Sequence, residues 1–157
     1  MSGDIRYQFR AGTRIPKGAT PEAVMEERDR IEHDYGKASI ATSVDAVVKH
    51  PEKYPVLRSF GPADADAAMR DGIAHGIRTA YQSVVIVRTE PKQKVAARQV
   101  RVIHSVKDSD GDLVYRTIQA IRKEPDQRKY LIGQLRRDAE LYHERMQDTL
   151  AEIEEAI

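Results

Sequence analysis

An acidic run at residues 108–112, Asp-Ser-Asp-Gly-Asp, is the first group in this sequence that could bind a metal ion. Calcium-binding loops place oxygen ligands at positions one, three and five of such a run. Here the glycine is fourth rather than sixth, and residue 119, at the twelfth position, is Gln rather than Glu. We therefore interpret the run as a turn between two strands and expect no metal site.

The remaining reactive side chains do not form a recognisable catalytic group. The five histidines are dispersed, without a His-Glu-x-x-His pair: His33, His50, His75, His104 and His143. The chain has no cysteine, which excludes disulfides and thiolate nucleophiles. It also lacks a Gly-x-Ser-x-Gly elbow, a Walker loop and a Gly-x-Gly-x-x-Gly turn. We predict a protein that is not an enzyme and needs no cofactor, leaving open carboxylate pairs that only the fold would assemble.

Basic residues gather in one predicted hairpin, although the whole chain is nearly neutral, with 26 basic and 25 acidic residues. Five of them could lie along a β-ribbon against phosphates: Arg88, Lys92, Lys94, Arg98 and Arg101. No aromatic residues are interleaved with them for base stacking. Nucleic-acid contact through residues 88–107 is therefore an alternative function, and protection of a sheet edge explains the same charges.

The elements that would position these residues include several strands. Ile5, Tyr7 and Phe9 alternate with polar residues, which predicts a half-buried strand ending at Gly12. The apolar run at 84–87 predicts a strand covered on both faces. A third strand is predicted from 97 to 107, and a short one follows the acidic turn at 113–115. Together they predict a small antiparallel sheet of three or four strands.

Helix signals surround these strands. Thr20 before Pro21 predicts a helix start, and Gly36 predicts its end. Thr42 or Ser43 is expected to begin a second helix, which stops before Pro51. A connector at 54–62, a helix at 63–83 and a short helix at 117–123 follow.

Small residues recur every four positions in the 63–83 helix: Ala68, Gly72, Gly76 and Ala80. Two interior glycines cost about 2 kcal/mol of helix propensity, so close approach of another backbone should compensate for them. We expect the C-terminal helix to be that partner in a helix–helix packing groove. A simple bend at Gly72 or Gly76 is the alternative.

The C-terminal residues 125–157 predict one long helix with a continuous apolar seam. Its eight apolar residues follow at steps of three and four: Leu131, Leu135, Ala139, Tyr142, Met146, Leu150, Ile153 and Ile157. Such a helix spans roughly 50 Å, whereas a compact chain of this size is on the order of 40 Å across, so we expect it to overhang a single domain of residues 1–157. The residues expected to bind a partner are Met146, Leu150, Ile153 and Ile157. A break at Gly133 is the alternative.

These elements together indicate an α+β fold: a small antiparallel sheet packed by helices, with the long C-terminal helix. The first 12 residues contain no apolar core of signal-peptide length, and no stretch approaches the ~20 apolar residues of a membrane span. We therefore expect a cytoplasmic protein without membrane contact, with association to a virion as the alternative.

In element order, the chain resembles a family of small phage- and prophage-associated bacterial proteins of unknown function. The resemblance rests on residues 7–15 (YQFRAGTRI), 43–48 (SVDAVV) and 57–60 (LRSF), followed by the Ala-rich helix, the strands at 84 and 102–106, and the long helix after Pro125. Residues 60–64 read Phe-Gly-Pro-Ala-Asp where the family carries Phe-Glu-Trp-Asp-Asp. The resemblance implies a phage-related accessory protein and supplies no site residues.

We therefore expect a non-enzymatic accessory protein that acts as a protein–protein binding or assembly module through its C-terminal helix. The expected partner is a second copy of the chain, another phage protein or a host protein. The alternatives are a nucleic-acid-binding or regulatory protein using the basic hairpin, and an inhibitor that offers its acidic tail to a basic cleft of a host enzyme.

Overall fold

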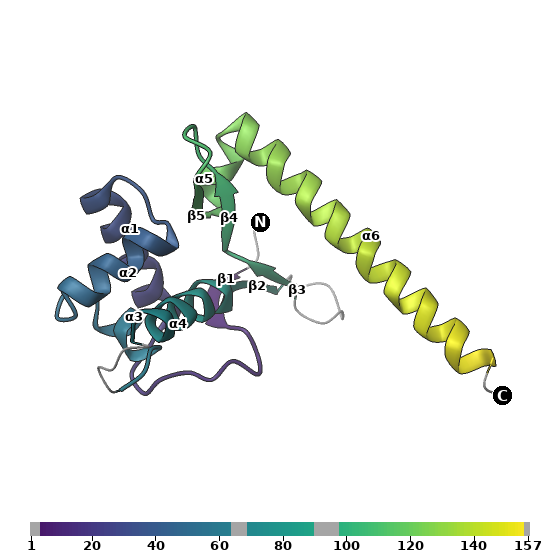
Figure 1. The fold of residues 1–157 in the computed structure, drawn as a ribbon, viewed down its shortest axis with the longest axis horizontal. Helices are drawn as coiled ribbons and strands as arrows, with labels where there is room; N and C mark the ends of the chain where they lie inside the picture. Colours follow the sequence, from purple (N-terminus) through teal and green to yellow (C-terminus); the bar gives the residue numbers. More distant parts are fainter. Residues whose placement is uncertain (1–3, 64–68, 90–97, 156–157) are drawn as a thin grey trace. The chain divides into compact units, whose positions relative to one another are not determined.

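The computed structural model describes residues 4–63, 69–89 and 98–155, which form six helices and two antiparallel sheets (Figure 1). The α+β fold predicted from the sequence is confirmed. The chain divides into two compact units, residues 1–118 and 119–157, which are described separately below. Among the described residues, no helix is both long enough and apolar enough to span a bilayer.

Helix α1 (Pro21–Tyr35) begins and ends at the residues that the sequence predicts. The Thr20 side chain accepts a hydrogen bond from the Ala23 amide at 3.2 Å, and Pro21 occupies the first helical turn. Gly36 ends the helix with a φ of 82°, a conformation that glycine adopts without steric cost.

Helix α2 (Ile40–Lys49) starts earlier than Thr42 or Ser43, the starts predicted from the sequence. Its N-cap is Ser39, whose side chain accepts from the Thr42 amide at 3.1 Å while the Thr42 hydroxyl accepts from the Ser39 amide at 3.0 Å. Ser43 is fully buried, and its hydroxyl lies 2.9 Å from the Tyr81 hydroxyl. A side chain used in the core is not available to cap a helix, so the cap moves to Ser39.

A short helix, α3 (Pro55–Ser59), occupies part of the segment expected to be an irregular connector. Its amide groups at Val56 and Leu57 each donate to the Glu27 carboxylate at 3.0 Å. Burial raises the pKa of Glu27, whereas these two amide hydrogen bonds lower it. Helix α4 (Met69–Ser83) follows in the region where a helix was predicted from residue 63.

Two separate sheets replace the single sheet of three or four strands that the sequence predicts. Strands β1 (Asp4–Phe9), β2 (Val84–Thr89) and β3 (Arg98–Arg101) form one antiparallel sheet in that order. Strands β4 (Ile103–Lys107) and β5 (Leu113–Thr117) form the other, joined by the acidic turn.

The strand predicted over 97–107 is divided at Val102, which is fully buried. Its amide donates to the Val84 carbonyl at 3.1 Å, and its own carbonyl accepts from the Ile118 amide at 2.7 Å. Val102 is thus the point where the chain passes from one sheet to the other. Val102, Ile103 and His104 are buried in succession, so burial does not alternate through this point.

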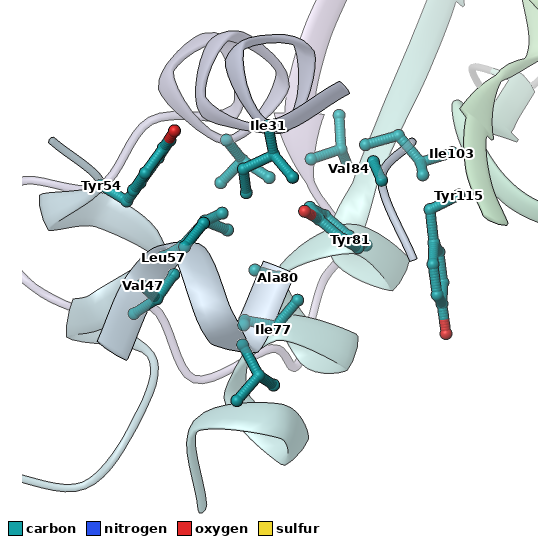
Figure 2. Packing of buried hydrophobic residues seen from close by; sticks show 14 of the residues in the cluster. Ile31, Val47, Tyr54, Leu57, Ile77, Ala80, Tyr81, Val84, Ile103 and Tyr115 are labelled. Atoms are coloured by element: carbon teal, nitrogen blue, oxygen red, sulfur yellow. The ribbon is translucent and has the colours of Figure 1, made fainter. Parts of the chain in front are cut away.

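The core of the first unit lies between helices α1 to α4 and the start of β2 (Figure 2). Tyr81 and Tyr115 have ring centroids 5.1 Å apart, which joins α4 to β5. The buried Arg28 of α1 also reaches β5, where its Nε donates to the Tyr115 carbonyl at 2.7 Å. Its two remaining nitrogens pair with Asp29 and Glu32, so the buried guanidinium is satisfied.

The second unit consists of most of the short helix α5 (Ile118–Arg122) and of helix α6 (Pro125–Glu155). Helix α6 is one continuous helix through Gly133, so the alternative of a break there is wrong (Figure 1). Its 31 residues span about 46 Å. Ile121 of α5 and Leu131 of α6 are buried.

Candidate functional site

Large apolar side chains are exposed along one face of α6. We define the α6 stripe as seven exposed residues: Ile132, Leu135, Ala139, Tyr142, Met146, Leu150 and Ile153. At 3.6 residues per turn these positions lie within an arc of about 80°. The six larger members expose between 42% and 67% of their surface, with Tyr142 the highest. The stripe is therefore continuous over about six turns of helix.

Three of the four residues expected to bind a partner belong to this stripe: Met146, Leu150 and Ile153. The fourth, Ile157, lies outside the described residues. Ile132 was missed from the sequence, although its step of three to Leu135 was a usable signal. Leu131 was counted in the seam, but it is buried and so does not belong to the exposed surface.

Leu141 is a useful contrast because it is exposed on another face of the same helix. Its exposed fraction is 50%, against 49% for Leu135. By helical geometry it lies about 140° from the centre of the stripe. A single exposed leucine needs no explanation, whereas a contiguous apolar surface indicates an interaction site.

The small-residue groove of α4 has a different partner from the expected one. A Cβ added at Gly76 would lie 2.5 Å from the Phe60 carbonyl oxygen, and one at Gly72 would lie 2.8 Å from the Pro62 ring. The close backbone approach that the glycines predict is thus made by residues 60–62, not by the C-terminal helix. Ala80 is fully buried, and Ala68 lies outside the described residues.

The predicted basic hairpin is only partly described, since Lys92 and Lys94 lie outside the described residues. Arg88 and Arg98 are opposite one another in the β2–β3 register. The Arg101 side chain folds back within the fold: its Nε donates to the Ile103 carbonyl at 3.0 Å, and burial lowers its pKa. Arg101 is thus engaged inside the chain, and no described contact favours phosphate binding here.

The acidic turn holds a cation that the chain itself supplies. The Lys37 ammonium lies 2.7 Å from Asp108, 3.3 Å from Asp110 and 3.0 Å from Asp112. These contacts raise the pKa of Lys37, and the hydrogen bond from Lys37 lowers the pKa of Asp108. The Asp108 carboxylate also accepts from the amides of Asp110 and Asp112, which fixes the turn between β4 and β5.

None of the histidines belongs to a group of three or more described side chains that could bind a metal ion. His104 is 9% exposed, and its Nε2 lies 3.0 Å from the Arg101 carbonyl oxygen, so it donates a hydrogen bond there. Burial, and then the nearby Arg101 charge, lower its pKa, and the ring is neutral at physiological pH.

The α6 stripe is therefore the surface among the described residues that most needs a partner. Comparisons of this chain with protein-family models, with curated proteins and with solved structures found no match.

Proposed function

We propose that this protein is a non-enzymatic assembly module that self-associates through the α6 stripe. The observation that carries the proposal is the row of seven exposed apolar residues on one face of a 31-residue helix. Water would otherwise cover this row along its whole length. Packing against a second copy removes it from water by the same knobs-into-holes contacts that hold long helices together elsewhere.

The size of the stripe predicts reversible association. Each of its six large side chains is about half exposed, so completing its burial contributes about 1 kcal/mol. Two copies together gain roughly 12 kcal/mol, which is comparable with the ~4–15 kcal/mol cost of association. We therefore expect an equilibrium that depends on protein concentration rather than a permanent complex.

The biological setting that we propose, an accessory protein of a phage or prophage, rests on the sequence resemblance alone. The α6 stripe is compatible with any setting in which copies of the chain must be brought together. The test of the function therefore addresses association itself.

The test compares two leucine substitutions on one helix by light scattering and sedimentation of the full chain over a range of micromolar concentrations. Leu135→Gln removes an apolar side chain from the stripe, and Leu141→Gln removes an equally exposed one from another face. Leucine and glutamine have similar helix propensities, so both variants keep the helix.

We expect Leu135→Gln to lose about 1 kcal/mol in each copy, which weakens a pair about 30-fold, and Leu141→Gln to associate like the parent chain. A parent chain that stays monomeric at every concentration would overturn the proposal. Equal weakening by the two variants would also overturn it, because the contact would then not lie on the stripe.

A further inference from the structure

The two halves of α6 carry opposite net charge. Residues 125–139 contain four basic and two acidic side chains, whereas residues 140–155 contain one basic and six acidic ones. Every charged residue in this range is exposed, so these charges are available to a neighbouring chain. A second copy running in the same direction would place acidic half against acidic half. A copy running in the opposite direction places each basic half against an acidic one.

The spacing of the stripe is close to symmetric about Tyr142. Leu135 and Ala139 lie seven and three residues before it, and Met146 and Leu150 lie four and eight residues after it. Reversing the direction of the helix therefore reproduces nearly the same apolar pattern. A surface that matches its own reverse can bury itself around a two-fold axis.

We infer that two copies of this chain pair antiparallel along the α6 stripe, about a two-fold axis near Tyr142. The inference rests on the proposed function, since it specifies how the self-associating surfaces meet. Leu135 then faces Leu150 of the second copy, and Ile132 faces its Ile153. The small Ala139 faces the larger Met146, and the two Tyr142 rings meet at the centre.

The polar border of the stripe fits the same orientation. Asp138 and Arg145 lie on one border, at nearly equal distances before and after the centre. In the antiparallel pair each Asp138 comes opposite an Arg145, and this happens twice because the axis is two-fold. Charged residues that flank an apolar seam select partner and orientation in this way.

An antiparallel pair has a functional consequence. The two Pro125 residues lie at opposite ends of the pair, roughly 50 Å apart at the rise of a helix. The two copies of residues 1–118 are then attached at opposite ends of a helical rod. The pair can present two identical surfaces to separate targets, which makes it a bivalent spacer.

The absence of cysteine makes the orientation directly measurable. Gln134→Cys and Thr149→Cys place one thiol on either side of the axis without removing a stripe residue. The full-length variants are treated, alone and mixed, with a bis-maleimide whose reach is well below the ~20 Å that separates identical positions in an antiparallel pair. The product is a covalent dimer seen by denaturing electrophoresis and mass spectrometry.

The inference predicts efficient crosslinking of the mixture, between the thiol introduced at position 134 of one variant and the thiol introduced at position 149 of the other. Either variant alone should crosslink little, so that the mixture gives roughly a tenfold higher initial rate, because only the mixed pair brings two thiols within reach.

Crosslinking of each variant alone, with little mixed product, would show parallel pairing and overturn the inference while leaving the proposed function intact. No crosslinking in a sample that scatters as a dimer would place the contact away from α6, and a monomeric sample would overturn the proposed function itself.

Discussion

Replacing Gly76 by alanine tests the packing of α4 against the preceding segment. Helix interiors normally favour alanine over glycine by about 1 kcal/mol. At this position, however, a Cβ atom would lie 2.5 Å from the Phe60 carbonyl oxygen, 2.6 Å from its carbonyl carbon and 2.9 Å from the Gly61 amide nitrogen. All three are backbone atoms, so no side-chain rotation can relieve the overlap.

The expected effect follows from the displacement that the new methyl group requires. Ordinary contact needs α4 and residues 60–61 to separate by about 1 Å, a gap that already forfeits up to half of the dispersion energy of the atoms lining it. Overpacking a filled site costs about 1–3 kcal/mol and occasionally more, and this site is bounded by backbone. After subtracting the gain in helix propensity, we expect Gly76→Ala to lower the free energy of unfolding by about 2 kcal/mol.

Gly133→Ala is the matched control, because it makes the same chemical change inside α6. The nearest atom to its added Cβ is the flexible Arg137 guanidinium, at 3.9 Å. This variant should therefore be neutral or more stable by up to about 1 kcal/mol. Urea unfolding followed by circular dichroism measures both variants. If Gly76→Ala proved as stable as the parent chain, the close approach of residues 60–61 to α4 would be refuted.

Two further outcomes concern buried polar groups of the first unit. Glu27→Gln leaves one side-chain oxygen to accept the two amides of α3 at Val56 and Leu57. Urea unfolding should show a free energy of unfolding lower by about 1–2 kcal/mol. The control Glu26→Gln, at an exposed position of the same helix, should leave this free energy unchanged. His104 has a folded-state pKa below its unfolded value, so its contribution to stability is complete above pH 6.5 and is lost as the pH falls below that value. As the pH falls from about 7.5 to 5.5, this group should lower the free energy of unfolding by no more than about 1.4 kcal/mol per pH unit. His104→Gln should make the free energy of unfolding depend less steeply on pH. An equally steep dependence in the variant would contradict the role given to His104.

Helix α1 shows what the sequence is able to specify, because the signals at both of its ends are local. Thr20 caps the amide three residues ahead, and Gly36 supplies the left-handed turn that ends the helix. Neither contact depends on the rest of the fold. For the same reason the acidic run at 108–112 was recognisable as a turn, although its bond to Lys37, 71 residues away, was not.

The division of the predicted 97–107 strand shows what a local pattern cannot specify. In the sequence, valines lie at even spacings from Val102 on both sides, as in a strand, and the strands β3 and β4 adjoin it directly. What changes at Val102 is the partner: β3 pairs with β2, and β4 pairs with β5. Alternation reports which face is buried and carries no information about the neighbouring strand.

Competition between neighbouring hydroxyl groups explains the shifted start of α2. Ser39, Thr42 and Ser43 are all good caps by residue type. Ser43 is not the N-cap because its hydroxyl lies in the core, within hydrogen-bonding distance of the Tyr81 hydroxyl of α4. The glycines of α4 behave similarly, since they correctly predicted a close approach but could not identify residues 60–62 as the segment that makes it.

Helix α6 combines a pattern visible in the sequence with a property that only the structure supplies. The residue types alone show its apolar seam and the change from a basic first half to an acidic second half. They do not show at which residue the helix changes from buried to exposed. Within the described part of α6, Leu131 is the one buried residue, so the 24 residues after it have no buried side chain. Most helical stability in proteins comes from packing of an apolar face, and isolated helices are only marginally stable in water. A contact along the α6 stripe would therefore stabilise the helix that forms it, so assembly and the folding of the distal part of α6 favour one another.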